Sequence, residues 1–299
     1  MKTIKQRISY AVMGLMAMGF TACTQNEDMA PTLKGQEINA TFSVGSMQTR
    51  VNTLGDGKNW EDKDKLKVSI FTEYDSGSTT VLSFNSTTNE WSRTGSFRWL
   101  NEYEQHTILA VYPSDMDSWI NNLQYDLQTD QSSEGNLKNA DLITGYWHDV
   151  PRFDLISIPM KHRMSLVTIV YHVGTADYPN MDISEPQVYS KHTSVDFSRD
   201  DRGQFVMSTP TANPAWVKAY KHDDGMFSAI VIPGSYIKDE VFLKFMIGDN
   251  IFNAKMKMPT DFEEGKRYTY KLDVGKDKVK LTQISVDDLT GWTNEEDLK

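Results

Sequence analysis

The sequence predicts an all-β protein made of two antiparallel β-sandwich domains, and three observations lead to this prediction. From residue 38 onward, apolar residues recur at every second position in segments of strand length. Turn-forming residues, such as Asp75-Ser76-Gly77 and Pro233-Gly234, separate these segments. No segment carries a long apolar stripe with a period of 3.6 residues, which argues against helical bundles and parallel α/β folds.

Composition sets broad limits on the protein. The 299 residues are 39% hydrophobic and 24% charged, which is typical of a folded globular chain. A single cysteine excludes an intramolecular disulfide framework and a cysteine-rich zinc site. The formal net charge of -10 gives no general electrostatic reason to bind nucleic acid or an anionic membrane.

Residues 1–22 have the pattern of a signal peptide. Positive residues at Lys2, Lys5 and Arg7 precede an apolar stretch from Ile8 to Phe20. That stretch is shorter than the ~20 residues that span a bilayer, and it suits the apolar region of a secretory signal.

Cys23 follows two small residues at the end of this segment. The pattern resembles a bacterial lipobox, with cleavage before Cys23 and lipid, including palmitate, on the new N-terminal residue. Two or more acyl chains hold a protein in a membrane that one chain would leave. The alternative is an ordinary signal peptide with an incidental cysteine. We favour lipidation because the only thiol of the chain lies where it would be used.

Residues 23–36 are expected to form a lipidated tether. They lack periodicity and contain Pro31 and Gly35, which is typical of a flexible linker. The acidic residues that follow Cys23 resemble the surface-export signals of Bacteroidetes lipoproteins. A simple solvated tether explains them equally well.

The N-terminal sandwich domain is expected over residues 37–162. Its first strand is Ile38–Val44, where apolar and polar residues alternate strictly. A short helix is expected at Asp115–Leu123, with Ser114 as its N-cap. Further strands with the same alternation are expected at 66–70, 79–84, 107–112 and 156–160.

The C-terminal sandwich domain is expected over residues 163–299. Met164–Val173 is apolar on both faces, which predicts a central strand near the junction of the two domains. Later strands are expected at 205–207, 226–232, 241–247, 252–258, 268–274 and 279–284.

No catalytic or metal-binding pattern emerges from the sequence. The six histidines are never three or four residues apart, and neither a nucleophile elbow nor a P-loop is present. Acidic runs such as Glu61–Asp64 lie in turn-like contexts, where solvated charge is the default, although counting carboxylates leaves a glycosidase pair open. We therefore expect a protein that is not an enzyme and that holds no metal or cofactor.

Aromatic residues are numerous, with 7 Trp, 13 Tyr and 13 Phe. These aromatic residues are candidates for a sugar-stacking platform. Trp91 and Trp99 flank an expected hairpin at Thr94-Gly95-Ser96, and Trp119, Tyr146 and Trp147 lie in loop-like stretches. Core filling is the simpler interpretation, because aromatic side chains bury large areas.

Several segments, in this order over roughly residues 36–293, resemble the fimbrillin-like lipoproteins of Bacteroidetes. Each motif is weak alone, and their order together with the lipobox-like segment is what carries the resemblance. The segments are Ile38–Phe42 with Gln48-Thr49-Arg50, Asn59–Val68, Leu109–Pro113, Asp141–Ile143 with Ile158–Met164, Phe262–Leu272, and Ile284 with Trp292.

The resemblance implies two transthyretin-like β-sandwich domains in a surface lipoprotein of the outer membrane. Members of that family are stalk, anchor or tip subunits of type V pili, or related surface lipoproteins. In stalk subunits, an arginine-specific protease cuts beyond the first strand, and a strand from the next subunit fills the groove that opens.

In this sequence, Arg50 matches the cleavable arginine. Ile38, Ala40, Phe42 and Val44 match the side chains of the removable strand. The resemblance leaves open that Arg50 is an ordinary loop residue and that the strand stays in place. Val279–Lys299 is the candidate donor segment for a neighbouring subunit.

We therefore expect a structural surface protein whose partners are other pilus subunits and the outer membrane, with a host glycan or protein as a further candidate. One alternative is a surface glycan-binding lipoprotein of a polysaccharide-uptake system, which coplanar exposed tryptophans would favour. A second alternative is a secreted hydrolase, which two carboxylates facing each other in a cleft would favour.

Overall fold

The computed structural model describes residues 32–288 except 45–59, 94, 117–119, 175–181, 212, 224 and 276–278. The chain divides into two compact units, residues 1–32 and residues 33–299, and the following description concerns the second unit. The predicted signal peptide, Cys23 and Arg50 lie outside the described residues.

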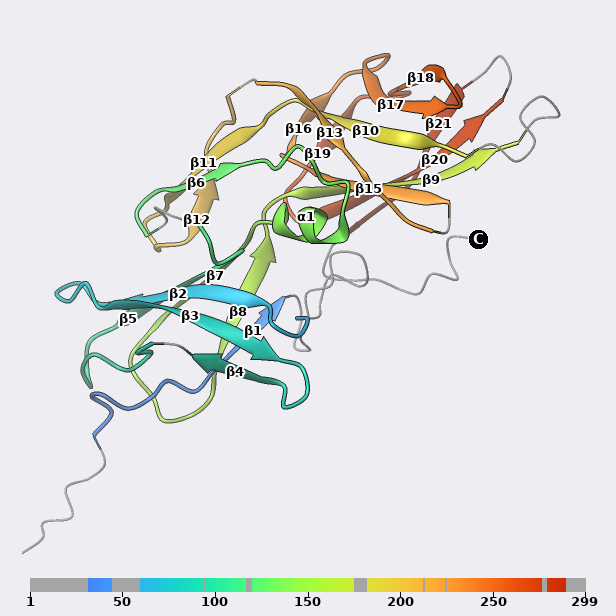
Figure 1. Cartoon of the computed structure of the whole chain (residues 1–299). Helices are drawn as coiled ribbons and strands as arrows, with labels where there is room; N and C mark the ends of the chain where they lie inside the picture. The colour runs from blue at the N-terminus through green and yellow to red at the C-terminus, as the bar shows by residue number, and fades with distance from the viewer. Residues whose placement is uncertain are drawn as a thin grey trace, which may run out of the picture. The chain divides into compact units, whose positions relative to one another are not determined.

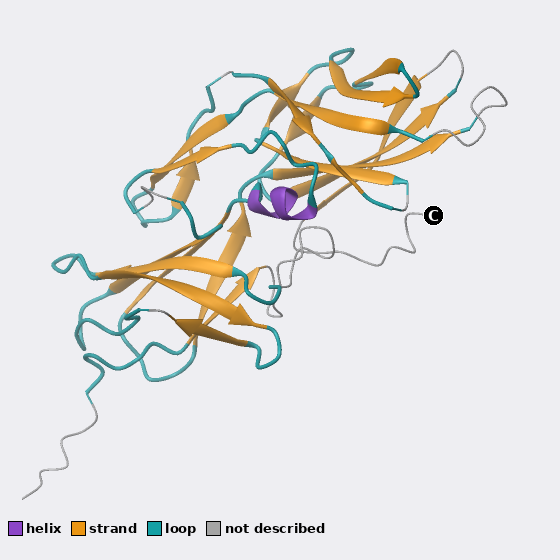
Figure 2. Cartoon of the chain, in the orientation of Figure 1, coloured by secondary structure: helices purple, strands orange, loops and turns teal. Residues whose placement is uncertain are grey.

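The prediction of an all-β protein is confirmed. Strands make up most of the described chain, and the one described helix is α1 (Glu134–Asn139) (Figure 2). None of the described helices has the length and apolar character needed to cross a bilayer.

The largest sheet has seven strands and contains most of the first half of the chain. Its order is β1-β8-β7-β5-β2-β3-β4, so β1 and β4 form its two edges. The strands in this order are β1 (Ala40–Val44), β8 (Ile156–His162), β7 (Ile143–Asp149), β5 (His106–Tyr112), β2 (Lys65–Phe71), β3 (Ser78–Asn85) and β4 (Glu90–Arg93).

Four smaller sheets contain the remaining strands. The five-stranded sheet consists of β14 (Tyr220–Lys221), β15 (Met226–Val231), β9 (Ser165–Val173), β20 (Lys266–Val274) and β21 (Val279–Asp288). The four-stranded sheet consists of β13 (Ala215–Lys218), β10 (Ser184–Ser190), β17 (Val241–Ile247) and β18 (Asn250–Lys255). The last two sheets are β12 (Phe205–Met207), β11 (Ser194–Arg199) and β6 (Leu123–Asp126), and the pair β16 (Gly234–Tyr236) and β19 (Thr260–Phe262).

Two strand pairs are parallel, which corrects the expectation of purely antiparallel sheets. β1 runs parallel to β8, and β9 runs parallel to β20. A parallel pair cannot be joined by a tight hairpin and needs a longer connection, and both pairs join segments about a hundred residues apart. β9 is the central strand of its sheet, as the apolar segment Met164–Val173 predicted.

The described apolar side chains form two hydrophobic clusters. The smaller cluster lies on the seven-stranded sheet and includes Phe42, Leu66, Ile108 and Ile158. β5 is buried along its whole length, and its alternate residues divide between the clusters. Ile108 belongs to the smaller cluster, whereas Leu109 belongs to the larger one. This double burial explains why Ile108–Tyr112 is continuously apolar, in place of the alternation expected at 107–112.

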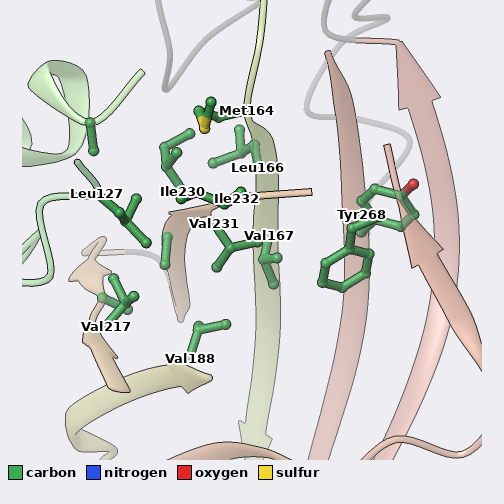
Figure 3. Close-up of a cluster of buried hydrophobic side chains, with 14 of the residues drawn as sticks. Leu127, Met164, Leu166, Val167, Val188, Val217, Ile230, Val231, Ile232 and Tyr268 are labelled. Atoms are coloured by element: carbon green, nitrogen blue, oxygen red, sulfur yellow. The ribbon is translucent and has the colours of Figure 1, made fainter. Parts of the chain in front are cut away.

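The larger cluster includes residues from before and after the predicted domain boundary. β6 pairs antiparallel with β11, and Leu127, which follows β6, joins side chains of β9 and β15. Figure 3 shows Leu127 beside Ile230, with Leu166 and Val167 on the neighbouring strand. The predicted boundary between His162 and Arg163, and the tandem transthyretin-like arrangement, stay predictions.

The helix expected at Asp115–Leu123 is wrong in its described part, because Leu123 begins strand β6. The helix forms instead at Glu134–Asn139, where the Ser133 hydroxyl accepts a hydrogen bond from the amide of Asn136 at 3.2 Å. An N-cap of this kind satisfies an amide that a short helix otherwise leaves without a partner.

Candidate functional site

The first strand of the described chain is an edge strand. β1 pairs with β8 from Ala40 opposite Ile156 to Val44 opposite Met160, and Figure 1 shows it beside β8. β8 is its only neighbour in the sheet order.

Alternate backbone groups of β1 face opposite edges of the strand. The carbonyl of Asn39 accepts a hydrogen bond from the amide of Ile156 at 2.9 Å, which directs this residue toward β8. The carbonyl of Phe42 therefore points to the other edge, where the indole N–H of Trp60 donates to it at 2.8 Å. Trp60, which follows the segment 45–59 in the chain, thus binds the backbone of β1, which precedes that segment.

The first half of β8 depends on β1 for strand pairing. The register of β7 with β8 covers only the last three residues of β8, from Met160 to His162. Because the amide of Ile156 points to β1, the nitrogen of Pro159 points to β7, and proline has no N–H to donate. Pro159 therefore ends the β7–β8 ladder, and residues 156–159 of β8 have β1 as their partner strand.

The strand expected at Ile38–Val44 begins at Ala40 in the structure, and three of the four alternating side chains from residue 38 to residue 44 are buried. Ile38 is 3% exposed, and Phe42 and Val44 are 0% exposed, whereas Ala40 is half-buried. Burying apolar side chains of this size stabilises a fold by about 1.5–3 kcal/mol each. The sequence pattern therefore identified the residues by which β1 completes the smaller cluster.

Phe42 belongs to an aromatic cluster that it forms with Trp60, Phe84, Trp91 and Tyr112. The ring of Phe42 meets Trp91 edge-on at 5.5 Å between ring centroids, and Trp91 lies 5.1 Å from both Trp60 and Phe84. Trp60 lies 5.8 Å from Tyr112, and burial raises the pKa of the Tyr112 phenol, so that it stays neutral. Edge-to-face pairs of this kind add about 0.5–1.5 kcal/mol each beyond their buried area.

The turn after Trp60 is fixed by a partly buried carboxyl group. The side chain of Asp64 accepts a hydrogen bond from the amide of Glu61 at 2.7 Å, and the Asp64 carbonyl accepts one from Phe84 at 2.8 Å. Burial raises the pKa of Asp64 to about 6, and the nearby charge of Glu61 adds to this effect. Glu61 in turn pairs with Lys138 of α1.

A cavity of about 430 Å³ lies beside the free edge of β1. The described lining residues come from residues 38–42, from residues 89–93 at β4, and from Leu82, Phe97 and Leu155. Glu90 is the only carboxylate among them. Both edge strands of the seven-stranded sheet therefore line the cavity, and its described lining does not contain the paired acids of a hydrolase site.

Charged residues hold the chain just before β1. Glu37 forms ion pairs with Arg93 at 3.1 Å and with Arg98 at 2.9 Å. The amide of Ile38 donates to the carbonyl of Phe97 at 3.1 Å. All three charged side chains are partly exposed, so we assign these pairs a role in alignment rather than a large contribution to stability.

The last strand of the described chain, β21, is also an edge strand. It pairs antiparallel with β20 over nine residue pairs, from Lys266 opposite Asp288 to Val274 opposite Val279. Leu281 is buried at 2% exposed, whereas Val286 is 46% exposed. The candidate donor segment therefore lies in a sheet through residue 288, and the structure does not describe residues 289–299.

The aromatic residues considered for sugar binding are largely packed against one another. Trp91 belongs to the aromatic cluster, and Trp99 is 2% exposed and lies 5.5 Å from Trp147. Trp119 lies outside the described residues. The described tryptophans of this set therefore do not form one coplanar exposed face.

Within the part of the chain that the structure describes, no three His, Cys, Asp or Glu side chains come together as a metal site would require.

The sequence identified the alternating residues of β1 but not the side chain that holds them. Trp60 was noted only as part of a motif, and its hydrogen bond to Phe42 joins residues 18 positions apart. An isolated tryptophan before an acidic turn was the available signal.

Comparisons with known proteins agree with this architecture. A family model described as fimbrillin-like matches residues 49–288. No curated protein sequence matches the chain.

Solved structures from three Bacteroides species share the fold. A candidate cell adhesion protein from Bacteroides ovatus is 15% identical with a TM-score of 0.64, covering 87% of this chain and 99% of its own. A candidate cell adhesion protein from Bacteroides uniformis is 16% identical with a TM-score of 0.58, covering 83% and 97%. A third, from Bacteroides fragilis, is 11% identical with a TM-score of 0.50, covering 87% and 99%.

Proposed function

Because the chain belongs to the fimbrillin-like family, we propose that it is a structural subunit of a surface fimbria and that it exchanges its first strand with a neighbouring subunit. The observation that carries this proposal is the position of β1. It is an edge strand, and its buried side chains complete a hydrophobic cluster.

The energetics of β1 support exchange over simple loss. The side chains of Ile38, Ala40, Phe42 and Val44 together contribute roughly 6–10 kcal/mol of gross hydrophobic stabilisation. This is comparable with the about 5–15 kcal/mol by which a whole domain is stable. A subunit that lost β1 would therefore expose an apolar groove and the unpaired half of β8. A strand from another chain would fill both by β-augmentation.

Arg50 is the proposed cleavage site, since a cut there separates β1 from Trp60 and the rest of the chain. The C-terminal segment Val279–Lys299 is the proposed donor to a neighbouring subunit. Both assignments rest on the resemblance to fimbrillin-like subunits and on the order of the residues in the chain.

Limited digestion with an arginine-specific protease tests the cleavage. We expect a cut after Arg50, followed by loss of the fragment that carries β1 and by ladders of subunits that resist dissociation. Arg50→Ala prevents both, whereas Arg202→Ala, at an exposed turn, leaves them unchanged. If the wild-type chain is cut after Arg50 and stays monomeric in the presence of its neighbours, the exchange proposal is wrong.

We also propose that the chain is anchored in the outer membrane by lipid on Cys23 and exposed at the cell surface. Cys23→Ser is expected to move the protein from the membrane fraction to the soluble fraction, and Thr24→Ser is the matched control. Equal membrane retention of the two variants contradicts the anchor.

A further inference from the structure

The aromatic cluster around β1 shows which kind of strand fits the site. Residues 38–44 contact the smaller cluster through four side chains: Ile38 and Val44 at the two ends, the partly buried Ala40, and the aromatic ring of Phe42. The ring has no exposed surface and packs edge-on against Trp91. A strand that replaced β1 without an aromatic ring here would leave a cavity.

Trp60 binds the backbone of Phe42. Its indole N–H, on a side chain that is 2% exposed, donates to the carbonyl of Phe42 at 2.8 Å. An indole N–H buried without an acceptor is costly, so an incoming strand must present a carbonyl at this point. Any strand presents a carbonyl to this edge at every second residue, so Trp60 determines which residues face outward, and the packing of the Phe42 ring fixes the register.

The C-terminal segment of this chain does not match that pattern. Trp292 is the only aromatic residue after Val279. With Trp292 at the position of Phe42, either Asp288 or Glu296 falls at the position of Ile38, depending on strand direction. That position is 3% exposed, and burying a carboxylate there without a partner is strongly unfavourable.

We propose that the site occupied by β1 selects a strand from a different protein, in which alternating apolar residues carry an aromatic ring at the third position, and that Trp60 binds the backbone carbonyl of that aromatic residue. This inference rests on the proposed function, because it concerns the strand that enters after β1 leaves. It further implies that copies of this chain do not polymerise through their own C-terminal segments.

Peptide exchange on the full mature chain tests the inference. A specific protease site placed within residues 45–59 allows β1 to be released, and a labelled peptide of residues 37–45 reports binding by fluorescence anisotropy. The competitors are the unlabelled peptide 37–45, its Phe42→Ala version, the peptide 279–288, and the peptide 286–295.

We expect the unlabelled peptide 37–45 to displace the label, and its Phe42→Ala version to bind at least about 100-fold more weakly. Neither C-terminal peptide is expected to compete at concentrations where peptide 37–45 saturates. Competition by a C-terminal peptide or by the Phe42→Ala version at nearly the affinity of peptide 37–45 overturns the inference while leaving strand exchange intact. Retention of the original β1 under all conditions overturns the proposed function and, with it, the inference.

The role of Trp60 has a separate readout. Trp60→Phe keeps the aromatic packing and removes the N–H, so the labelled peptide is expected to dissociate about fivefold faster. Trp216→Phe, in strand β13, is the matched control and should leave the dissociation rate unchanged. Equal dissociation rates for the wild type and Trp60→Phe would remove the assignment of Trp60.

Discussion

The first and last strands of the described chain occupy sheet edges in different ways. β1 is short, and its side chains Phe42 and Val44, together with Ile38 just before it, are buried in a hydrophobic cluster. β21 is twice as long and pairs with β20 over nine residue pairs. Of its described apolar side chains, Leu281 is buried, Val279 is half-buried and Val286 is 46% exposed.

The contrast indicates that an edge strand can be held by its side chains or by its backbone ladder. A backbone hydrogen-bond ladder, like that of β21, forms with almost any sequence. A strand whose side chains are buried, like β1, requires particular side chains. β1 is thus the strand whose replacement demands a matching partner. The exposed residues of β21 place few constraints on its sequence, which is compatible with the proposed role of this segment as a donor strand.

The largest expected effect is at Phe42. Phe42→Ala should lower the free energy of unfolding by about 3–5 kcal/mol, since it removes a fully buried ring and leaves a cavity beside Trp91. Denaturant unfolding followed by tryptophan fluorescence measures this change. A loss below about 1 kcal/mol would break the contrast, because β1 would then be held by its backbone like β21.

A smaller loss is expected at the last strand. Leu281→Ala should cost about 2 kcal/mol, since Leu281 is buried but lies on an edge strand whose other side can relax. The same denaturation experiment applies, with Thr282→Ala as the neighbouring control. If Leu281→Ala destabilises the chain as much as Phe42→Ala, the two strands are held alike.

Lowering the pH should stabilise the turn that follows Trp60, near β1. Because the folded pKa of Asp64 is raised from 3.8 to about 6, the folded chain binds a proton before the unfolded chain does. Its contribution to stability therefore grows as the pH falls through 6 and levels off near 4.

Between pH 7.5 and pH 5, the wild type should gain about 1 kcal/mol relative to Asp64→Asn, after allowance for partial exposure. Unfolding curves of both proteins at the two pH values measure this difference, and the other carboxylates cancel in the comparison. Parallel pH profiles for the two proteins would exclude Asp64 as the titrating group.

The smallest effect is expected at Val286. Val286→Ala should change the unfolding free energy by less than about 0.5 kcal/mol, because the side chain is largely exposed. A thermal melt beside Leu281→Ala, on the same strand, measures the difference between an exposed and a buried position. A large loss at Val286 would contradict its exposed position on β21.

The sequence predicted the strands well wherever alternation and burial coincide. Residues 156–162 alternate between buried and exposed side chains along β8, as their period of two required. The helix α1 was missed because its six residues are too few to display a helical period. The pairing of β6 with β11 was missed because it joins segments some seventy residues apart, and no local pattern encodes such a register.

The candidate site was predicted in the same uneven way. Phe42 and Val44 followed from alternation alone, since a buried face is a property of the strand itself. The contact of Trp60 with the Phe42 carbonyl depends on where the chain lies after residue 59. The effect of Pro159 on the β7–β8 ladder depends on its nitrogen facing β7. Both require the three-dimensional arrangement.

β1 also lies between Cys23 and Arg50 in the chain. If Cys23 carries lipid as proposed, a cut after Arg50 would leave the lipid and β1 on one fragment and the remaining strands on the other. After the cut, no covalent bond would connect the larger fragment to the membrane. Non-covalent binding of β1 in its sheet would be the remaining attachment. The rate at which β1 dissociates, to which the buried ring of Phe42 contributes, would then determine how long a cleaved subunit stays attached to the membrane.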